Sequence, residues 1–85
     1  MDNRYQIFDS REKDLYVGVC NNYFKVSEAK ETYRKSLNKE VIDDSILIEI
    51  AKSGGKEVEA VITFGVEEGE HFALALLNLC NSIKR

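Results

Sequence analysis

The sequence predicts a two-layer α+β domain in which a mostly antiparallel four-stranded sheet carries two helices on one face. Four short segments have the two-residue apolar alternation of strands, and two longer segments have the spacing of amphipathic helices. These segments follow one another in the order ββαββα. The chain has 85 residues and no proline, so we expect a single small domain over residues 1–85. It consists of two hairpin-helix halves, at about 1–42 and 43–85.

The first half is expected to hold two strands and a one-sided helix. Residues 5–8 are aromatic and β-branched, and residues 14–20 alternate in polarity, both of which are typical of strands. Ser27 is expected to cap the following helix, because its hydroxyl can accept a hydrogen bond from an amide of the first turn. Apolar residues then recur every three or four positions as far as Val41, which predicts a helix with one apolar stripe.

The second half repeats this layout with little residue identity. Residues 46–51 alternate as a strand, and Ser53-Gly54-Gly55 supplies the positive φ angles of a tight hairpin. Residues 56–64 form the return strand, and a final helix is expected from about Glu68 to Ile83. One face of the return strand is expected to collect Val58, Ala60, Ile62 and Phe64.

The final helix is more apolar than a helix lying on one sheet needs. With an advance of about 100° per residue, its apolar side chains fill an arc of roughly 200°, although an arc of about 100° suffices for one sheet. Large exposed apolar patches are uncommon on monomers, and a small domain gains from extra burial. We therefore expect a two-fold homodimer. The residues expected at its interface are Phe72, Leu74, Leu77 and Cys80.

Two alternatives to this interface remain open. The first helix could cover one flank of the final helix, which would leave a monomer. The far face of the sheet is a second candidate interface, and its exposed side chains are expected to be Tyr16, Cys20, Leu47 and Val61.

No motif in the sequence indicates catalysis, a metal or a cofactor. The only histidine, His71, and the two cysteines, Cys20 and Cys80, do not have the spacing of metal ligands. His71 follows three glutamates, but no motif ties a nucleophile to it, so we interpret it as a surface residue. We therefore expect that the protein is not an enzyme. An enzyme built around His71 is the alternative. The segment Ser53–Lys56 resembles part of a phosphate loop, but a strand follows it where a phosphate loop needs a helix.

The chain is expected to be cytoplasmic. The segment Met1–Tyr5 has no apolar run after a basic start, so no signal peptide is expected. In a reducing compartment, Cys20 and Cys80 are expected to be buried thiols rather than a disulfide. No stretch approaches the roughly 18 apolar residues of a membrane span, so no membrane partner is expected.

The charge distribution favours an anionic partner for the first half of the chain. The net charge of −3 is the sum of +1 over residues 1–42 and −4 over residues 43–85, which argues against a general nucleic-acid binder. A basic and aromatic group surrounds the first helix, and we expect it to bind a partner protein or a small anionic ligand. Its residues are Tyr23, Lys25, Lys30 and Arg34.

The sequence therefore predicts a small, non-catalytic binding or regulatory protein, such as an inhibitor or a sequestering protein, which forms a homodimer. The alternative is a nucleic-acid-binding module that uses the region from Tyr23 to Lys35, in which aromatic rings stack on bases and cations neutralise phosphates.

Overall fold

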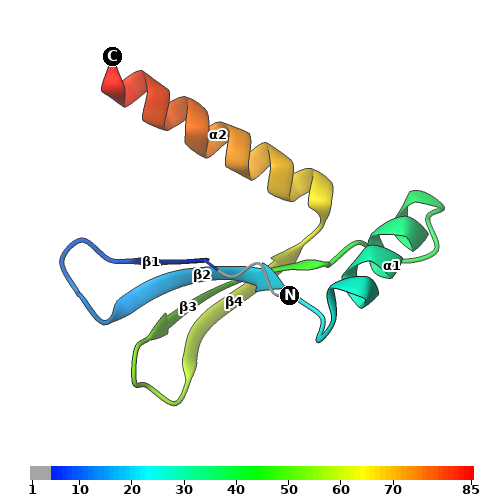
Figure 1. Ribbon diagram of the computed structural model, residues 1–85, viewed down its shortest axis with the longest axis horizontal. Coiled ribbons are helices and arrows are strands. Elements are labelled where there is room, and N and C mark those ends of the chain that lie inside the picture. Colours follow the sequence, from blue (N-terminus) through cyan, green and yellow to red (C-terminus); the bar gives the residue numbers. More distant parts are fainter. Residues whose placement is uncertain (1–4) are drawn as a thin grey trace.

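The four strands form one antiparallel sheet, and the predicted α+β class and ββαββα order are confirmed (Figure 1). The computed structural model describes residues 5–85; residues 1–4, on which the signal-peptide expectation rests, lie outside the described residues. In their spatial order the strands are β1 (Tyr5–Phe8), β2 (Leu15–Asn21), β3 (Ile46–Lys52) and β4 (Val58–Phe64). The helices are α1 (Val26–Leu37), between β2 and β3, and α2 (Val66–Lys84), after β4.

The register of the strands gathers apolar side chains on the sheet face that α2 overhangs. One row across the four strands runs Ile7, Val17, Ile50, Ala60, and the next runs Tyr5, Val19, Ile48, Ile62. Because successive side chains of a strand point to opposite faces, the alternating positions face away from α2. As expected, these positions include Tyr16, Cys20, Leu47 and Val61.

The register shifts between Ile50 and Ala51, and this irregularity changes one expectation about β4. Ile50 pairs with Ala60, but Ala51 pairs with Val58 rather than with the residue next to Ala60. The extra residue in β4 turns Val58 to the face of Ala51, because a bulge reverses the alternation of side chains beyond it. Val58 therefore does not share a face with Ala60.

Helix α1 projects beyond the end of the sheet instead of covering its face, which differs from the two-layer arrangement that we expected (Figure 1). The reason is that β2 ends beside the start of β3, so the connection that contains α1 leaves and re-enters the sheet at the same end of the strands. Asn22 closes it, because its amide N–H donates to the Ser45 carbonyl at 2.8 Å and its side-chain nitrogen to the Asp44 carbonyl at 2.9 Å. The Tyr23 hydroxyl donates to Asp44 Oδ1 at 2.6 Å.

The ends of α1 also differ from the sequence-based expectation. The cap is Lys25 rather than Ser27, and the Glu28 carboxylate accepts a hydrogen bond from the Lys25 amide at 2.9 Å. The helix ends at Leu37, and Lys39 has a left-handed φ of 61°, a conformation that stops a helix. Val41 therefore lies outside α1.

Helix α2 is held against the sheet near its N-terminus. The Val66 amide donates to Asp43 Oδ2 at 2.9 Å, which caps the N-terminus of α2. Gly65 makes room for this carboxylate, because a Cβ there would lie 2.6 Å from Asp43 Oδ2. A Cβ on Gly69 would lie 2.8 Å from Ile46 Cδ1, so the α2 backbone touches the sheet at this point. Beyond it α2 rises away from the sheet, and its remaining side chains are exposed (Figure 1).

As a result, a single chain has almost no hydrophobic core. Among residues 5–85 the buried apolar side chains are those of Ala29 and Ala51, and no large side chain is fully buried. The accessible surface is 7076 Å², whereas a compact monomer of this mass exposes about 5,100 Å². The radius of gyration is 14.8 Å, against about 12 Å for a compact chain of this length.

Candidate functional site

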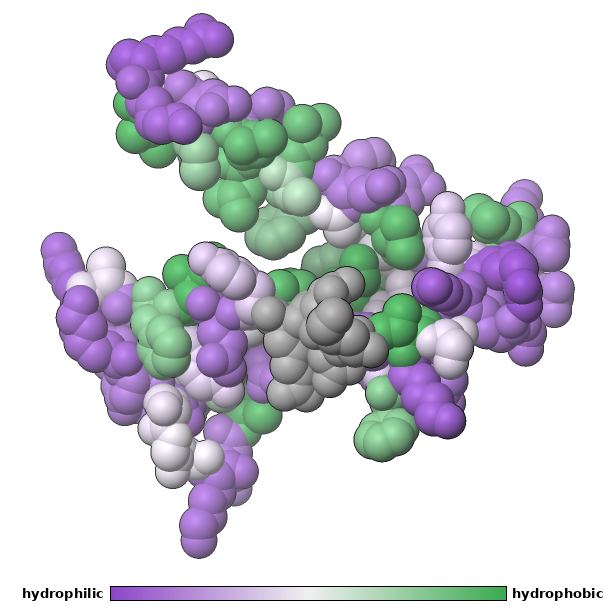
Figure 2. Space-filling model, viewed as in Figure 1, coloured by the Kyte–Doolittle hydropathy of each residue, from purple (hydrophilic) through white to green (hydrophobic). Residues whose placement is uncertain are grey.

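The most prominent surface of the molecule is an apolar groove between α2 and the sheet, which we call the open face. Figure 2 shows apolar side chains on the side of α2 that overhangs the sheet and on the sheet opposite, with a gap between them. The groove has a volume of about 560 Å³. Side chains from all four strands and from α2 line it, among them Ile7, Val17, Ile48, Phe64, Phe72 and Leu76.

The four residues expected at a dimer interface all lie on the exposed part of α2. Phe72 lines the open face, and the centroid of its ring lies 6.4 Å from that of the Phe64 ring in an edge-to-face arrangement. Leu74 and Leu77 are each 56% exposed, although a leucine is normally among the most buried residues. Cys80 is exposed as well. Nothing within residues 5–85 covers these side chains.

The two cysteines are free, and neither is the fully buried thiol that we expected. Cys20 is half-buried on the sheet face away from α2, and Cys80 is exposed on α2. No disulfide joins them. The exposure of Cys80 has the same cause as that of Leu77, because α2 leaves the sheet after its first turn.

The four residues of the predicted basic and aromatic group do not converge on one site. The Tyr23 hydroxyl is bonded to Asp44, and this hydrogen bond raises the pKa of Tyr23 above its usual value. Lys25 caps α1, and Arg34 forms an ion pair with Glu31 one turn earlier.

Lys30 lines a separate cavity of about 380 Å³ between α1 and the adjoining end of the sheet. Tyr33, Asn21 and Ser45 also line it. Ser45 is only 4% exposed, and its hydroxyl has no hydrogen-bond partner in the described part of the chain. Most of the side chains that line the cavity are apolar, among them Val26, Ala29 and Ile46, and Lys30 is the charged residue of the lining. No sequence pattern pointed to Ser45, because only the fold brings it beside Lys30.

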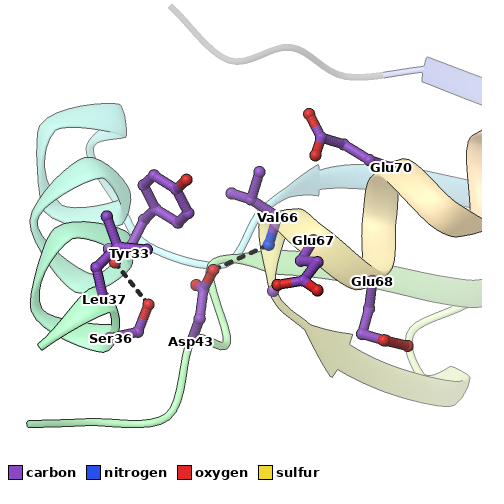
Figure 3. A pocket seen from close by; sticks show the side chains of 9 residues that line it. Tyr33, Ser36, Leu37, Asp43, Val66, Glu67, Glu68 and Glu70 are labelled. Carbon is purple, nitrogen blue, oxygen red and sulfur yellow. Dashed lines mark hydrogen bonds between the residues drawn. The ribbon is translucent and has the colours of Figure 1, made fainter. Parts of the chain in front are cut away.

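A third hollow, of about 560 Å³, separates α1 from the N-terminus of α2 and is acidic (Figure 3). Asp43 lies at its centre, turned toward the Val66 amide that it caps, and Glu67, Glu68 and Glu70 come from the first turns of α2. The hydroxyl of Ser36, which also lines the hollow, donates to the Tyr33 carbonyl at 2.6 Å. These carboxylates therefore stabilise the N-terminus of α2, Asp43 by capping it and the glutamates through their charge near the positive end of the helix dipole.

His71 lies on the exposed surface of α2, where its Nδ1 atom is 3.9 Å from Glu68 Oε1. It does not line the acidic hollow. Over residues 5–85, no group of three or more His, Cys, Asp or Glu side chains is placed to hold a metal ion. In the same range no helix has both the length and the apolar character needed to cross a membrane.

Comparison of the chain with protein-family models, with curated proteins and with solved structures gave no match.

Proposed function

We propose that this protein is a small, non-catalytic binding protein that acts as a homodimer and engages a partner protein or a small anionic ligand. The open face carries the proposal. It presents an apolar sheet and an apolar helix to each other without closing a core between them, and such a surface is unstable in water unless something covers it.

The amount of exposed surface supports a second protein chain as the cover. The chain exposes about 2,000 Å² more than a compact monomer of its mass. Half of that excess already exceeds the roughly 800 Å² that each partner buries in a standard interface. Apolar surface of this extent supports an obligate homodimer, because such interfaces resemble a domain core cut in half.

The cavity beside α1 supports a small anionic ligand. Lys30 supplies the positive charge among the residues that line this cavity, whereas the hydroxyl of Ser45 is buried beneath its surface. The cavity's volume of about 380 Å³ lies within the range of small-molecule sites. A ligand held by Lys30 would be a carboxylate or a phosphate of modest size.

Native mass spectrometry of the purified protein tests both parts of the proposal. We expect a species with the mass of two chains, and a retained anion that is lost in Lys30→Ala but kept in Lys56→Ala, which removes a lysine from the β3–β4 hairpin. A monomer at every concentration would overturn the homodimer. A dimer that carries no anion, even after incubation with a mixture of carboxylates and phosphates, would overturn the ligand site alone.

A further inference from the structure

We propose that the open face and the cavity beside α1 together form one site for a fatty acid, whose carboxylate lies at Lys30 and whose alkyl chain fills the space between α2 and the sheet. This inference rests on the proposed function, because it uses the anion site at Lys30, and it adds the chemical class of the ligand. The second copy keeps a surface of its own to cover. Leu74, Leu79 and Ile62 are all more than half exposed, and they do not line the groove.

The groove and the cavity adjoin each other on the same side of the sheet. Val19, Ile46 and Val66 line both of them. Val19 pairs with Ile48, and Ile46 stands two residues before Ile48, so these strand side chains all project toward the face that α2 overhangs. A single elongated ligand can therefore occupy both hollows.

The groove is suited to an alkyl chain because its side chains offer few hydrogen bonds. Among the described residues that line it, the polar side chains are those of Tyr5 and Glu70. A well-held water molecule needs about two to four polar partners, so water in this groove is poorly held. The volume of about 560 Å³ is within the range of small-molecule sites. The groove is therefore stabilised most by an occupant without polar groups.

The charges of the two hollows fix the direction of the ligand. Glu70 is the charged residue of the groove lining, and Lys30 is the charged residue of the cavity lining. Glu70 repels an anionic head group and Lys30 attracts it, so the head group lies beside α1 and the alkyl chain extends beneath α2. The hydroxyl of Tyr33, which also lines the cavity, is a hydrogen-bond donor for the head group.

A single lysine favours a carboxylate over a phosphate as the head group. A carboxylate carries one negative charge, which the ammonium group of Lys30 balances. A phosphate monoester carries about 1.5 to 2 negative charges at neutral pH, so part of its charge would stay uncompensated. Among residues 5–85 the cavity lining contains no second cation. We therefore expect a fatty acid rather than an alkyl phosphate.

A series of alkyl lengths tests whether the tail enters the groove. Isothermal titration calorimetry of the full-length protein with octanoate, decanoate and dodecanoate, each below the concentration at which it forms micelles, measures the three dissociation constants. Each step adds two methylene groups, and burial of both is expected to lower the dissociation constant about 15-fold. A fall of less than about twofold per step would place the tail outside the groove and overturn the inference.

Decanol, which has the alkyl chain of decanoate but no charge, separates the head group from the tail. Lys30→Ala is expected to raise the dissociation constant of decanoate about threefold to fivefold, as the loss of an exposed ion pair does, and to leave that of decanol unchanged. Lys56→Ala, at the β3–β4 hairpin, is the control. Equal effects of Lys30→Ala on both ligands would overturn the placement of the carboxylate. Decyl phosphate is expected to bind more weakly than decanoate, and tighter binding would overturn the choice of a fatty acid.

Two strand variants of matched exposure test the position of the tail. Ile7 lines the groove and is 53% exposed, whereas Val61 is 55% exposed on the opposite face of the sheet. Ile7→Ser is expected to raise the dissociation constants of decanoate and decanol alike by about threefold to tenfold, and Val61→Ser by less than about twofold. Leu76→Ala, which shortens a lining residue of α2, is expected to act as Ile7→Ser does, so a loosened β1 does not account for the result. Unchanged affinity in Leu76→Ala, or equal effects of the two strand variants, would overturn the inference.

The outcomes separate this inference from the proposed function. If octanoate and dodecanoate bind equally well and both depend on Lys30, the fatty-acid site is overturned, and the anion site and the homodimer still stand. A protein that binds no carboxylate and no phosphate would overturn the anion site together with this inference, whatever its oligomeric state.

Discussion

Truncation of Leu77 is the sharpest single perturbation of the open face. Burying a leucine side chain fully is worth about 1.5–3 kcal/mol. Leu77 is 56% exposed in one chain, so a dimer that buries it gains roughly 1–1.5 kcal/mol per copy, and about 2–3 kcal/mol from both copies. Leu77→Ala is therefore expected to raise the dissociation constant of the dimer roughly 30-fold to 100-fold, at about 1.4 kcal/mol for each factor of ten.

The assay is sedimentation velocity over a dilution series of the full chain, with Ile42→Ala as the matched control. Ile42 is 88% exposed in the loop after α1, away from the open face, so its truncation is expected to change the dissociation constant less than twofold. Alanine favours helix more than leucine does, so a loss of helicity in α2 cannot imitate the effect. The reasoning would be refuted if the Leu77→Ala dimer had the same dissociation constant as the original dimer while the Ile42→Ala dimer was weaker.

Two further predictions concern how the elements are held. Gly65→Ala is expected to lower the unfolding temperature, because a Cβ 2.6 Å from Asp43 Oδ2 would displace the cap of α2. The loss should shrink in an Asp43→Gly background, which removes the Oδ2, Cγ and Cβ atoms that this Cβ would meet, and equal losses in the two backgrounds would contradict this account. The hydrogen bond to Asp44 raises the pKa of Tyr23. The stabilising effect of this hydrogen bond is therefore present below the ordinary tyrosine pKa, and it is lost as pH rises through the raised value. Ultraviolet titration of tyrosinate should therefore show the pKa of Tyr23 falling in Asp44→Asn, and an unchanged pKa would argue against this bond.

The sequence predicted the features that depend on local periodicity. Alternation identifies a strand such as β3 because successive side chains point to opposite faces whatever the strand pairs with. The wide apolar arc of α2 likewise follows from residue order alone, and it correctly indicated that side chains such as Leu77 are not covered by their own chain.

The features that depend on pairing between residues far apart in the chain could not be predicted from the sequence. The position of α1 follows from the pairing of Asn21 with Ile46, which brings the two ends of its connection together. The orientation of Val58 follows from an irregularity in the pairing of β3 with β4.

The candidate binding residues failed to converge for a related reason. Closeness in sequence does not fix the direction of a side chain or the partner that it finds. Tyr23 bonds to Asp44, which is 21 residues away, and Arg34 pairs with Glu31 on its own helix. Ser45, the buried hydroxyl beside Lys30, carries no pattern that sets it apart from the other serines of the chain.

Completion of α2 and the sheet by another copy of the chain is the central claim of the proposed function. Sedimentation equilibrium of the unmodified protein at micromolar concentration measures this directly. We predict the mass of two chains, which falls toward the mass of one chain on dilution or in Leu77→Ala. The mass of a single chain at all concentrations, in a protein whose circular dichroism shows the folded sheet and helices, would contradict it.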